Sequence, residues 1–484
     1  MDADRLEELG VQAFPAPLLR IAKEVGGREV MFNTAALGAA AGVTGLDLGP
    51  MNSVMEDNFG RKGAAVAEGN RKVARAAFDF MQERYAARFP WKLQTRNSAK
   101  RMVLNGNQAF SMGALLGGCK FVAGYPMTPG SPVLEWLAAH AQRYGIVVKH
   151  TEDEISAAAM VVGAAHMGVR ALTPTSGGGF CQMTESLGLA GMTETPIVIY
   201  NAQRPGPSTG LPTRTEQGDL MFVLHASQGD FPRIVLAPGT IEETFEAGWR
   251  AFNLAETYQC PVIVLTDHFL VSSLRDVPPE ALDFGAVTIE RGKLLSRAEM
   301  DALPDDYLRH RVTDDGISPR AVAGHPQGVY SVTSDEHDEA GHIDEAAETR
   351  NAQNEKRMRK LETAAGEMRP PLRYGPAEAD VTFIDWGSTY GPLREAVDLL
   401  NTDGTKANLL HITDVWPFPT RAVAQALAGA KKTFVVESNY TGQMAGLIRR
   451  ETGHQADGVI LRYDGRAFSP ESILRGFEEE MHHG

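Results

Sequence analysis

The sequence contains few cysteines. Only Cys119, Cys181 and Cys260 occur in 484 residues, and they lie far apart in the chain. Within this chain they cannot build a disulfide framework, a zinc site with paired cysteines or a four-cysteine iron–sulfur site. Cysteine usage of this kind predicts a reducing, cytoplasmic setting.

Long apolar runs and an excess of positive charge are also missing. No apolar run reaches the ~18 residues of a membrane-spanning helix, and no basic and apolar signal peptide opens the chain. The net charge is −14, from 47 basic and 61 acidic side chains. This balance argues against a broad nucleic-acid-binding surface, although it leaves room for a local basic pocket. We therefore expect a soluble protein that binds neither membrane nor nucleic acid.

The length exceeds what one compact core needs. At ~100–200 residues per domain, two to four domains are expected. The apolar share of 43% and the charged share of 22% are those of a globular protein, which excludes general disorder and a fibre. The 49 glycines and 27 prolines indicate many functional loops.

Two ranges differ clearly in their hydrophobic pattern. Residues 1–91 predict a mainly helical segment, because residues 72–81 are apolar at helical spacing. Residues 92–273 alternate short apolar runs with helical runs, which indicates a parallel sheet covered on both faces. The predicted strands are 121–124, 146–149, 170–173, 196–200, 233–236 and 261–265. In such sheets ligands bind beyond the carboxyl ends of the strands.

The rest of the chain falls into a linker and a second α/β domain. Residues 274–376 show no clear period and predict a crossover linker. The dense charge of residues 335–362 predicts a solvated, irregular segment. Residues 377–484 return to strand–helix alternation, with predicted strands at 381–385, 408–412 and 433–437.

The loop after the first predicted strand is stiff. Residues 124–132 read Gly-Tyr-Pro-Met-Thr-Pro-Gly-Ser-Pro, and the prolines fix the backbone while Gly130 permits an unusual angle. Thr128 offers a hydroxyl beside a predicted helix N-terminus, where carboxylates and other anions are attracted. A rigid turn that binds no ligand is the alternative interpretation.

The loop after the second strand carries an acidic cluster. Thr151 and Glu154 have the spacing of a capping box, and the residues alone favour that structural role. Small residues follow Glu154, however, so a bulky ligand could come close to it. Its carboxylate would then hold a protonated heterocycle nitrogen.

Two further loops follow strands. The run Thr-Ser-Gly-Gly-Gly-Phe at residues 175–180 lets a ligand approach the backbone, but it lacks the lysine of a phosphate loop, so a tight turn is an equal alternative. Arg204 begins a loop rich in Pro and Gly, and its guanidinium suits bidentate binding of a carboxylate. Pairing of Arg204 with a surface acid is the other interpretation. Because all four loops follow strands, they could converge on one edge of the sheet.

These motifs together resemble the 2-oxoacid:ferredoxin oxidoreductase family. Residues 125–131 resemble the family's Tyr-Pro-Ile-Thr-Pro signature, and Glu154, the glycine triplet and residues 203–210 follow in the family's order. The resemblance runs from about residue 105 to the C-terminus, and it is to the alpha subunit, mostly of the 2-oxoglutarate type. Further matching motifs lie at residues 333–342, 356–361, 386–391, 416–419 and 436–440.

The resemblance implies a fold and a reaction. Residues 92–273 would form the pyrimidine-binding type of thiamine-diphosphate-binding domain, and residues 377–484 a transketolase C-terminal-like domain. The reaction implied is oxidative decarboxylation of a 2-oxoacid with coenzyme A, giving an acyl-CoA and reduced ferredoxin, or its reverse. Thiamine diphosphate would be shared with a beta-type subunit that supplies Mg²⁺ and the [4Fe-4S] cluster, so no metal ligand is expected here.

The resemblance also implies roles for single residues. Glu154 would hydrogen-bond the aminopyrimidine of the cofactor and so favour the tautomer that takes the thiazolium proton. Thr128 and Arg204 would bind the 2-oxo-carboxylate end of the substrate. The cofactor contacts would also include Gly178, Gly179 and Phe180.

The sequence departs from the family in two places. Residues 1–91 resemble only the C-terminal half of the gamma domain, which opens with a Gly-rich turn and takes part in coenzyme A binding. Met127 and Gly130 stand where the commoner pattern has Ile and Ser. The alternative functions are a pyruvate or branched-chain 2-oxoacid oxidoreductase subunit, a non-catalytic assembly subunit of the same fold, and a non-oxidative thiamine enzyme. The last is disfavoured because a Gly-Asp-Gly…Asn diphosphate motif is missing.

Overall fold

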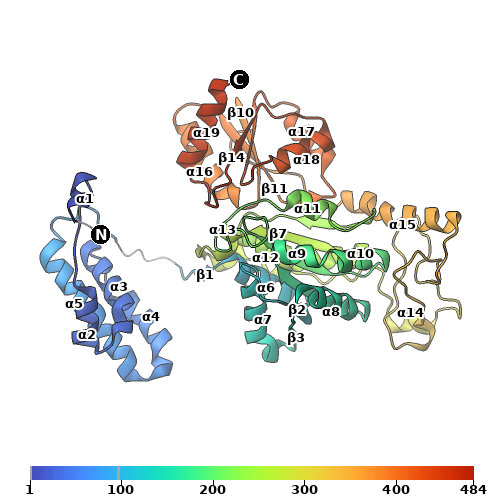
Figure 1. Ribbon diagram of the computed structural model, residues 1–484, viewed down its shortest axis with the longest axis horizontal. Helices are drawn as coiled ribbons and strands as arrows, with labels where there is room; N and C mark the ends of the chain where they lie inside the picture. The colour runs from blue at the N-terminus through green and yellow to red at the C-terminus, as the bar shows by residue number, and fades with distance from the viewer. Residues whose placement is uncertain (1–2, 95–98, 484) are drawn as a thin grey trace. The chain divides into compact units, whose positions relative to one another are not determined.

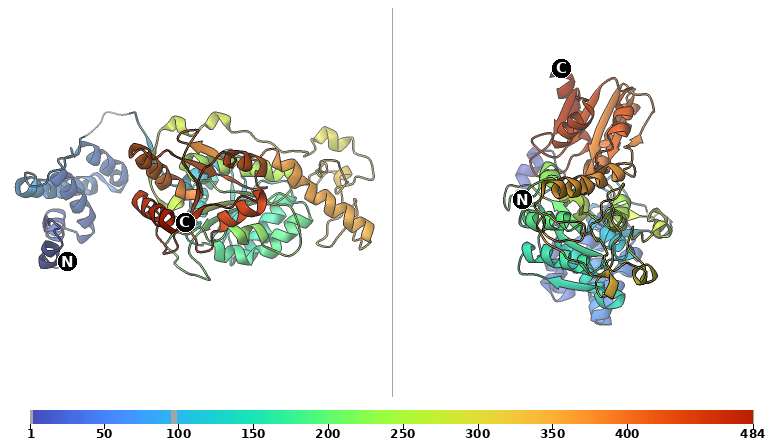
Figure 2. Two further views of the ribbon diagram at one scale, coloured as in Figure 1. Left: turned by 90° about the horizontal axis from the view of Figure 1, so that it is seen from above. Right: turned by 90° about the vertical axis from the view of Figure 1, so that its right-hand side faces the viewer.

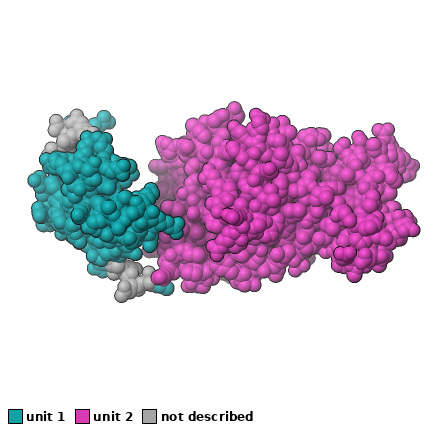
Figure 3. All heavy atoms as spheres, turned by 90° about the horizontal axis from the view of Figure 1, so that it is seen from below, with its two compact units in different colours: residues 1–99 teal, residues 100–484 magenta. Residues whose placement is uncertain are grey.

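The first of two compact units is helical, as the sequence predicts. The computed structural model describes residues 3–94 and 99–483, and the units are residues 1–99 and 100–484 (Figures 1 and 3). In the first unit the apolar stripe of α5 buries Val73, Ala77 and Met81 against α2 and α3. Its elements are α1 (Ala3–Glu8), α2 (Leu18–Gly26), η1 (Glu29–Met31), α3 (Phe32–Thr44), α4 (Gly49–Phe59), η2 (Gly60–Lys62) and α5 (Ala64–Tyr85).

The second unit is built on a seven-stranded sheet with the order β12-β6-β7-β5-β4-β2-β3. All neighbouring strands are parallel except β12, which pairs antiparallel with β6. Each of the six strands predicted between residues 121 and 265 is present, with ends that differ from the prediction by at most three residues. The seven strands of the sheet are β2 (Phe121–Gly124), β3 (Val147–His150), β4 (Ala171–Thr175), β5 (Val198–Gln203), β6 (Ile234–Leu236), β7 (Val262–Asp267) and β12 (Asp414–Trp416).

Helices cover both faces of this sheet, as expected for buried parallel strands. One face packs on α8 (Glu154–His166), α9 (Gly177–Gln182), α10 (Thr184–Met192) and α11 (Leu220–His225). The opposite face packs on α6 (Gly106–Leu116), α7 (Ser131–Tyr144) and α12 (Ile241–Tyr258). Alternate strand residues divide between the two cores: Ile199 faces the first and Val198 and Tyr200 the second.

The C-terminal part forms a five-stranded sheet with the order β14-β13-β10-β11-β9. The three strands predicted there are present, whereas β9, β12 and β14 are additional. The elements are β9 (Leu372–Tyr374), β10 (Val381–Trp386), η6 (Gly387–Thr389), α16 (Tyr390–Thr402), β11 (Ala407–Ile412), α17 (Thr420–Leu427), β13 (Thr433–Glu437), α18 (Gln443–Thr452), β14 (Gly458–Leu461) and α19 (Pro470–His483). Gln217 ties the two sheets together, since its amide donates to the Trp386 carbonyl at 2.7 Å and accepts from the Ser438 amide at 2.8 Å.

The segment between the two sheets corrects a sequence prediction. The prediction of a solvated, irregular run at residues 335–362 is wrong, because α15 (Ala347–Ala365) begins inside it and buries Lys356, Arg357 and Lys360 completely. Figures 1 and 2 show α14 and α15 at one end of this unit. The other elements outside the two large sheets are β1 (Met102–Leu104), α13 (His268–Ser272), β8 (Arg275–Val277), η3 (Pro279–Ala281), η4 (Phe284–Ala286), α14 (Arg297–Asp301) and η5 (Pro326–Gly328).

Within residues 3–94 and 99–483, none of the helices is long and apolar enough to span a membrane.

Candidate active site

The four loops singled out in the sequence lie on one edge of the seven-stranded sheet. They follow β2, β3, β4 and β5, and these strands are neighbours in the order β5-β4-β2-β3. Because the four strands are parallel, their carboxyl ends meet at the same edge. Thr128, Glu154, the glycine triplet and Arg204 are thereby brought to one place.

Glu154 is the first residue of α8 and is only 2% exposed. One carboxylate oxygen, Oε2, accepts a hydrogen bond from Gln182 Nε2 at 2.8 Å. The other oxygen, Oε1, is buried and has no hydrogen-bond partner among the residues that the structure describes. Burial, and to a smaller degree the neighbouring Asp153, raise the pKa of Glu154. A buried, unpaired carboxylate oxygen is costly in a folded protein, and a ligand that donates a hydrogen bond there would remove that cost.

The predicted capping role of Glu154 is wrong. The N-cap of α8 is Asp153, which accepts from the Ser156 amide at 2.7 Å, and Ser156 returns the capping-box contact. Thr151 instead donates to the Asp153 carbonyl. The carboxylate of Glu154 therefore does not cap the helix, and it is available for another role.

The glycine triplet packs closely against Glu154. A Cβ atom at Gly179 would lie 2.6 Å from Glu154 Oε1 and 2.3 Å from Thr175 Oγ1, so no side chain fits there. The Gly179 amide donates to Met127 Sδ at 3.2 Å, which joins the triplet to the loop after β2. Phe180 points the other way, into the core against Phe222, so any cofactor contact of this residue is through its backbone.

Arg204 and Thr128 are in direct contact. Arg204 Nη1 donates to the Thr128 carbonyl oxygen at 2.7 Å, while Arg204 Nε is buried and finds no partner within residues 3–94 and 99–483. The Thr128 residue itself is exposed. Its loop is held from behind, because Asn107 Nδ2 donates to the Pro129 carbonyl at 2.9 Å. A fixed cation with an unpaired donor, next to an accessible hydroxyl, suits a small carboxylate ligand.

The departure from the family pattern at Gly130 has a steric cause. A Cβ atom at this position would lie 2.5 Å from the Thr175 carbonyl oxygen. The backbone of the β2 loop therefore runs closer to the end of β4 than a serine at this position allows.

The structure adds two site residues that the sequence did not reveal. Gln182 reaches Glu154 from the end of α9. Asp219 lies against Gly177, where a Cβ atom would be 2.4 Å from its Oδ2, and it accepts from Asn201 Nδ2 at 3.2 Å. Burial raises the pKa of Asp219 to about 6, although Asn201 and the nearby Arg204 act in the opposite direction. Both residues approach the site through tertiary packing, and no spacing in the sequence signals this.

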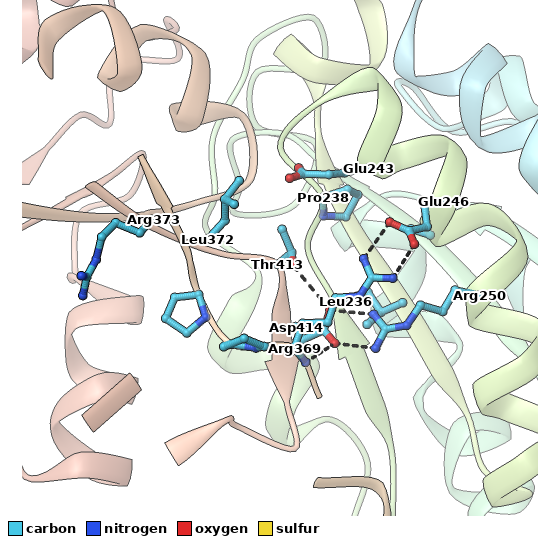
Figure 4. Close-up of a pocket in the computed structure, with 13 residues that line it drawn as sticks. Leu236, Pro238, Glu243, Glu246, Arg250, Arg369, Leu372, Arg373, Thr413 and Asp414 are labelled. Atoms are coloured by element: carbon cyan, nitrogen blue, oxygen red, sulfur yellow. Dashed lines mark hydrogen bonds and ion pairs between the residues drawn. The ribbon is translucent and has the colours of Figure 1, made fainter. Parts of the chain in front are cut away.

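A cavity of about 420 Å³ lies elsewhere, between α12 and the start of the C-terminal sheet (Figure 4). Two of the three arginines that line it are already paired with acids: Arg250 with Asp414 at 2.6 Å, and Arg369 with Glu246 at 2.7 Å. These pairs tie α12 to the C-terminal part. Among residues 3–94 and 99–483, no group of three or more His, Cys, Asp or Glu side chains is arranged to hold a metal ion.

Three family descriptions match the chain. Residues 112–356 match "Pyruvate flavodoxin/ferredoxin oxidoreductase, thiamine diP-bdg", so this stretch carries the family's thiamine-diphosphate-binding domain. Residues 379–473 match "Pyruvate:ferredoxin oxidoreductase core domain II". Residues 2–80 match "Pyruvate ferredoxin/flavodoxin oxidoreductase".

Curated relatives carry two kinds of name. The 2-oxoacid:ferredoxin oxidoreductase subunit alpha of Saccharolobus solfataricus is 36% identical over 99% of this chain and 77% of its own. Subunit alpha of 2-oxoacid:ferredoxin oxidoreductase 1 from Sulfurisphaera tokodaii is 39% identical, and the chain spans only 64% of its length. The 2-oxoglutarate synthase subunit KorA of Methanothermobacter thermautotrophicus is 36% identical over 77% of this chain and 96% of its own.

A solved structure has the same fold. The 2-oxoglutarate:ferredoxin oxidoreductase from Magnetococcus marinus, determined with 2-oxoglutarate, coenzyme A and succinyl-CoA bound, superposes with a TM-score of 0.89 at 34% identity. The match covers 98% of this chain and 81% of that one. The predicted fold, a parallel-sheet domain of the thiamine-diphosphate-binding type followed by a second α/β domain, is thereby confirmed.

Proposed function

Because the chain belongs to the 2-oxoacid:ferredoxin oxidoreductase family, as an alpha subunit, we propose that it works with a beta-type subunit to oxidise a 2-oxoacid. The carboxyl carbon leaves as CO₂, the acyl group is transferred to the thiol of coenzyme A, and the two electrons released pass to ferredoxin. 2-Oxoglutarate is the proposed substrate, since several relatives are named for it. The reverse reaction, reductive carboxylation, uses the same site.

The observation that carries this proposal is the buried oxygen Oε1 of Glu154, which lacks a hydrogen-bond partner among residues 3–94 and 99–483. A ring nitrogen that bears a proton would satisfy Glu154 Oε1. The residues present therefore fit the aminopyrimidine end of thiamine diphosphate. That cofactor, when bound, supplies the carbon nucleophile that attacks the 2-oxo group. Glu154 holds a proton at the ring nitrogen, and burial favours this sharing because it disfavours an isolated carboxylate.

The substrate end of the site is assigned to Arg204 and Thr128. We propose that Arg204 binds the carboxylate of the 2-oxoacid through its unpaired Nε and that the Thr128 hydroxyl donates to the same group. Anchoring of Nη1 on the Thr128 carbonyl holds the guanidinium in place before substrate arrives. Preorganisation of this kind places the 2-oxo carbon toward the cofactor without further ordering cost.

Arg204→Lys should raise the KM for the 2-oxoacid by roughly ten- to hundred-fold, because a lysine loses the planar fork and the contact to Thr128. The affinity for thiamine diphosphate should stay nearly unchanged. Steady-state kinetics of the alpha–beta complex measure the first and a cofactor titration the second. Arg214→Lys, an exposed arginine on the same loop, is the matched control. An unaltered KM would show that Arg204 is structural.

The partner is proposed from what surrounds the site. Exposed apolar side chains lie next to three of its residues: Tyr125 before Thr128, Ile155 after Glu154 and Leu211 beyond Arg204. Apolar groups gathered around a polar site are typical of a surface that another protein covers. A beta-type subunit would cover it and would bring the Mg²⁺–diphosphate site and the [4Fe-4S] cluster, for which the three cysteines of this chain do not suffice.

The purified chain alone should be colourless, bind thiamine diphosphate weakly and reduce no viologen dye with any 2-oxoacid. A beta-type subunit should restore all three properties. The same assay, run with 2-oxoglutarate, pyruvate and a branched-chain 2-oxoacid, decides the substrate, with the highest kcat/KM expected for 2-oxoglutarate. Dye reduction by the iron-free chain without its partner would overturn the two-subunit proposal.

A further inference from the structure

The two oxygens of the Glu154 carboxylate lie in different surroundings. Oε2 accepts from the Gln182 amide at 2.8 Å, whereas Oε1 packs against Gly179 and has no hydrogen-bond partner in the described part of the chain. A carboxylate can turn about its last bond, so a single contact on one oxygen decides where the other one points. That contact comes from Gln182.

We infer that Gln182 is a positioning residue that aims Glu154 Oε1 at the cofactor. Gln182 and Gly179 are three residues apart on α9, so they lie on the same side of this short helix and both meet Glu154. Gln182 holds Oε2 by its hydrogen bond, and Gly179, which has no side chain, packs closely against Oε1. The orientation of Glu154 is thus set by the chain before any ligand binds.

The choice of an amide for this contact has a chemical consequence. A lysine or arginine in place of Gln182 would form an ion pair with Glu154 and stabilise its charged form. A neutral amide fixes the carboxylate with a weaker pull on its charge, so Glu154 keeps its raised pKa. The residue that shares a proton with the cofactor is therefore held in place and still basic.

The helix that carries Gln182 is itself held firmly. The Phe180 ring is buried against Phe222, with the ring centroids 5.3 Å apart. The Gly179 amide donates to Met127 Sδ, and the Phe180 amide donates to the Ser176 carbonyl at 2.8 Å. These contacts hold α9 on both sides of Gly179, so the position of the Gln182 side chain follows from the fold.

The inference rests on the proposed role of Glu154, and two substitutions in the alpha–beta complex test it. Gln182→Met keeps the length of the side chain but removes the donor. It should lower kcat about tenfold and weaken thiamine diphosphate binding severalfold, whereas the KM for the 2-oxoacid should stay unchanged because Gln182 does not contact Arg204 or Thr128. Calorimetric titration of the cofactor-free complex gives the affinity independently of turnover.

Gln182→Glu separates positioning from packing. At high pH its carboxylate repels Glu154, but when protonated it donates a hydrogen bond in the place of the amide. Its turnover relative to wild type should therefore recover as the pH is lowered. Asp153, which precedes Glu154, carries the same charge in the variant and in wild type. Its effect therefore cancels when the turnover of the variant is divided by that of wild type. A loss that is the same at every pH would show that Gln182 only fills space, and would overturn the inference.

A matched control is Gln142→Met, the same substitution at an exposed position of α7. It should change neither turnover nor cofactor affinity. If Glu154→Gln abolishes activity and Gln182→Met equals wild type, the inference fails and the proposed function stands. If Glu154→Gln turns over like wild type, the proposed function fails and this inference falls with it.

Discussion

Glu154→Gln is expected to lower the turnover of the alpha–beta complex by roughly ten- to hundred-fold. The substitution removes the charge at Oε1, and loss of a hydrogen bond to a charged group costs ~1.5–3 kcal/mol. The loss is larger if proton sharing with the cofactor controls the rate. The kcat at saturating 2-oxoacid and coenzyme A measures the effect. Turnover at the wild-type level would remove Glu154 from the mechanism.

The same substitution should leave the fold as stable as before. The pKa of Glu154 is raised in the folded chain, which means that folding disfavours the charged carboxylate. A neutral amide avoids this cost, so the thermal midpoint should stay constant or rise while activity falls. A residue kept for structure would show the opposite pattern. Active-site residues commonly lower the stability of the fold while they serve the reaction.

Asp153→Asn is the matched control for Glu154→Gln. It neutralises the adjacent acid, but asparagine caps helices as well as aspartate does, so α8 should remain intact. Turnover should stay close to wild type. Comparing the two variants shows whether turnover needs the charge of Glu154 itself or only an acidic side chain at this helix N-terminus.

The sheet and its functional edge could be predicted because their signals are local. Each buried strand is a short apolar run, and Gly, Pro or acidic residues mark its end. Since the strands are parallel, the loops that carry Thr128, Glu154 and Arg204 had to lie on one edge. Which oxygen of Glu154 is free, and which arginine donor is unpaired, depends on side chains that meet only after packing. Gln182 and Asp219 belong to this second class.

The charged run at residues 335–362 shows where sequence patterns mislead. A densely charged run predicts a solvent-exposed segment, and for most such runs this prediction is right. Here Glu336 accepts from Arg357 at 2.8 Å, and Glu194, more than a hundred residues earlier, takes up the charge of Lys356 and Lys360. Buried charges need partners, and a partner so distant in the chain cannot be recognised from the run itself.

Glu194→Gln is expected to lower the unfolding free energy of the second unit by ~3–5 kcal/mol. Glu194 is fully buried, and its carboxylate contacts Lys356 Nζ at 2.5 Å, Lys360 Nζ, and His310 Nδ1 at 3.0 Å. Burial by itself would raise the pKa of Glu194, but the two lysines outweigh it and hold the pKa well below its usual range. An uncharged glutamine leaves both ammonium groups buried without a counter-charge.

The exposed ion pair of Asp380 with Lys431 provides the control. Their nitrogen and oxygen lie 2.6 Å apart, but the side chains are 54% and 70% exposed. Asp380→Asn should therefore change the unfolding free energy by less than ~1 kcal/mol. Urea unfolding followed by circular dichroism compares the two variants with wild type. A Glu194→Gln protein as stable as the control would show that the buried cluster is not held by charge.

A third variant tests the cause of the instability. Combining Glu194→Gln with Lys356→Met and Lys360→Met removes both buried ammonium groups and keeps side chains of similar length. Neutral residues that replace a whole buried ion cluster are often as stable as the cluster, because the desolvation cost disappears with the charges. The triple variant should therefore recover most of the stability lost in Glu194→Gln. If it is as unstable as the single variant, the loss comes from packing around Glu194, whose carbonyl also accepts from Arg309 at 2.9 Å, and not from the unpaired lysines.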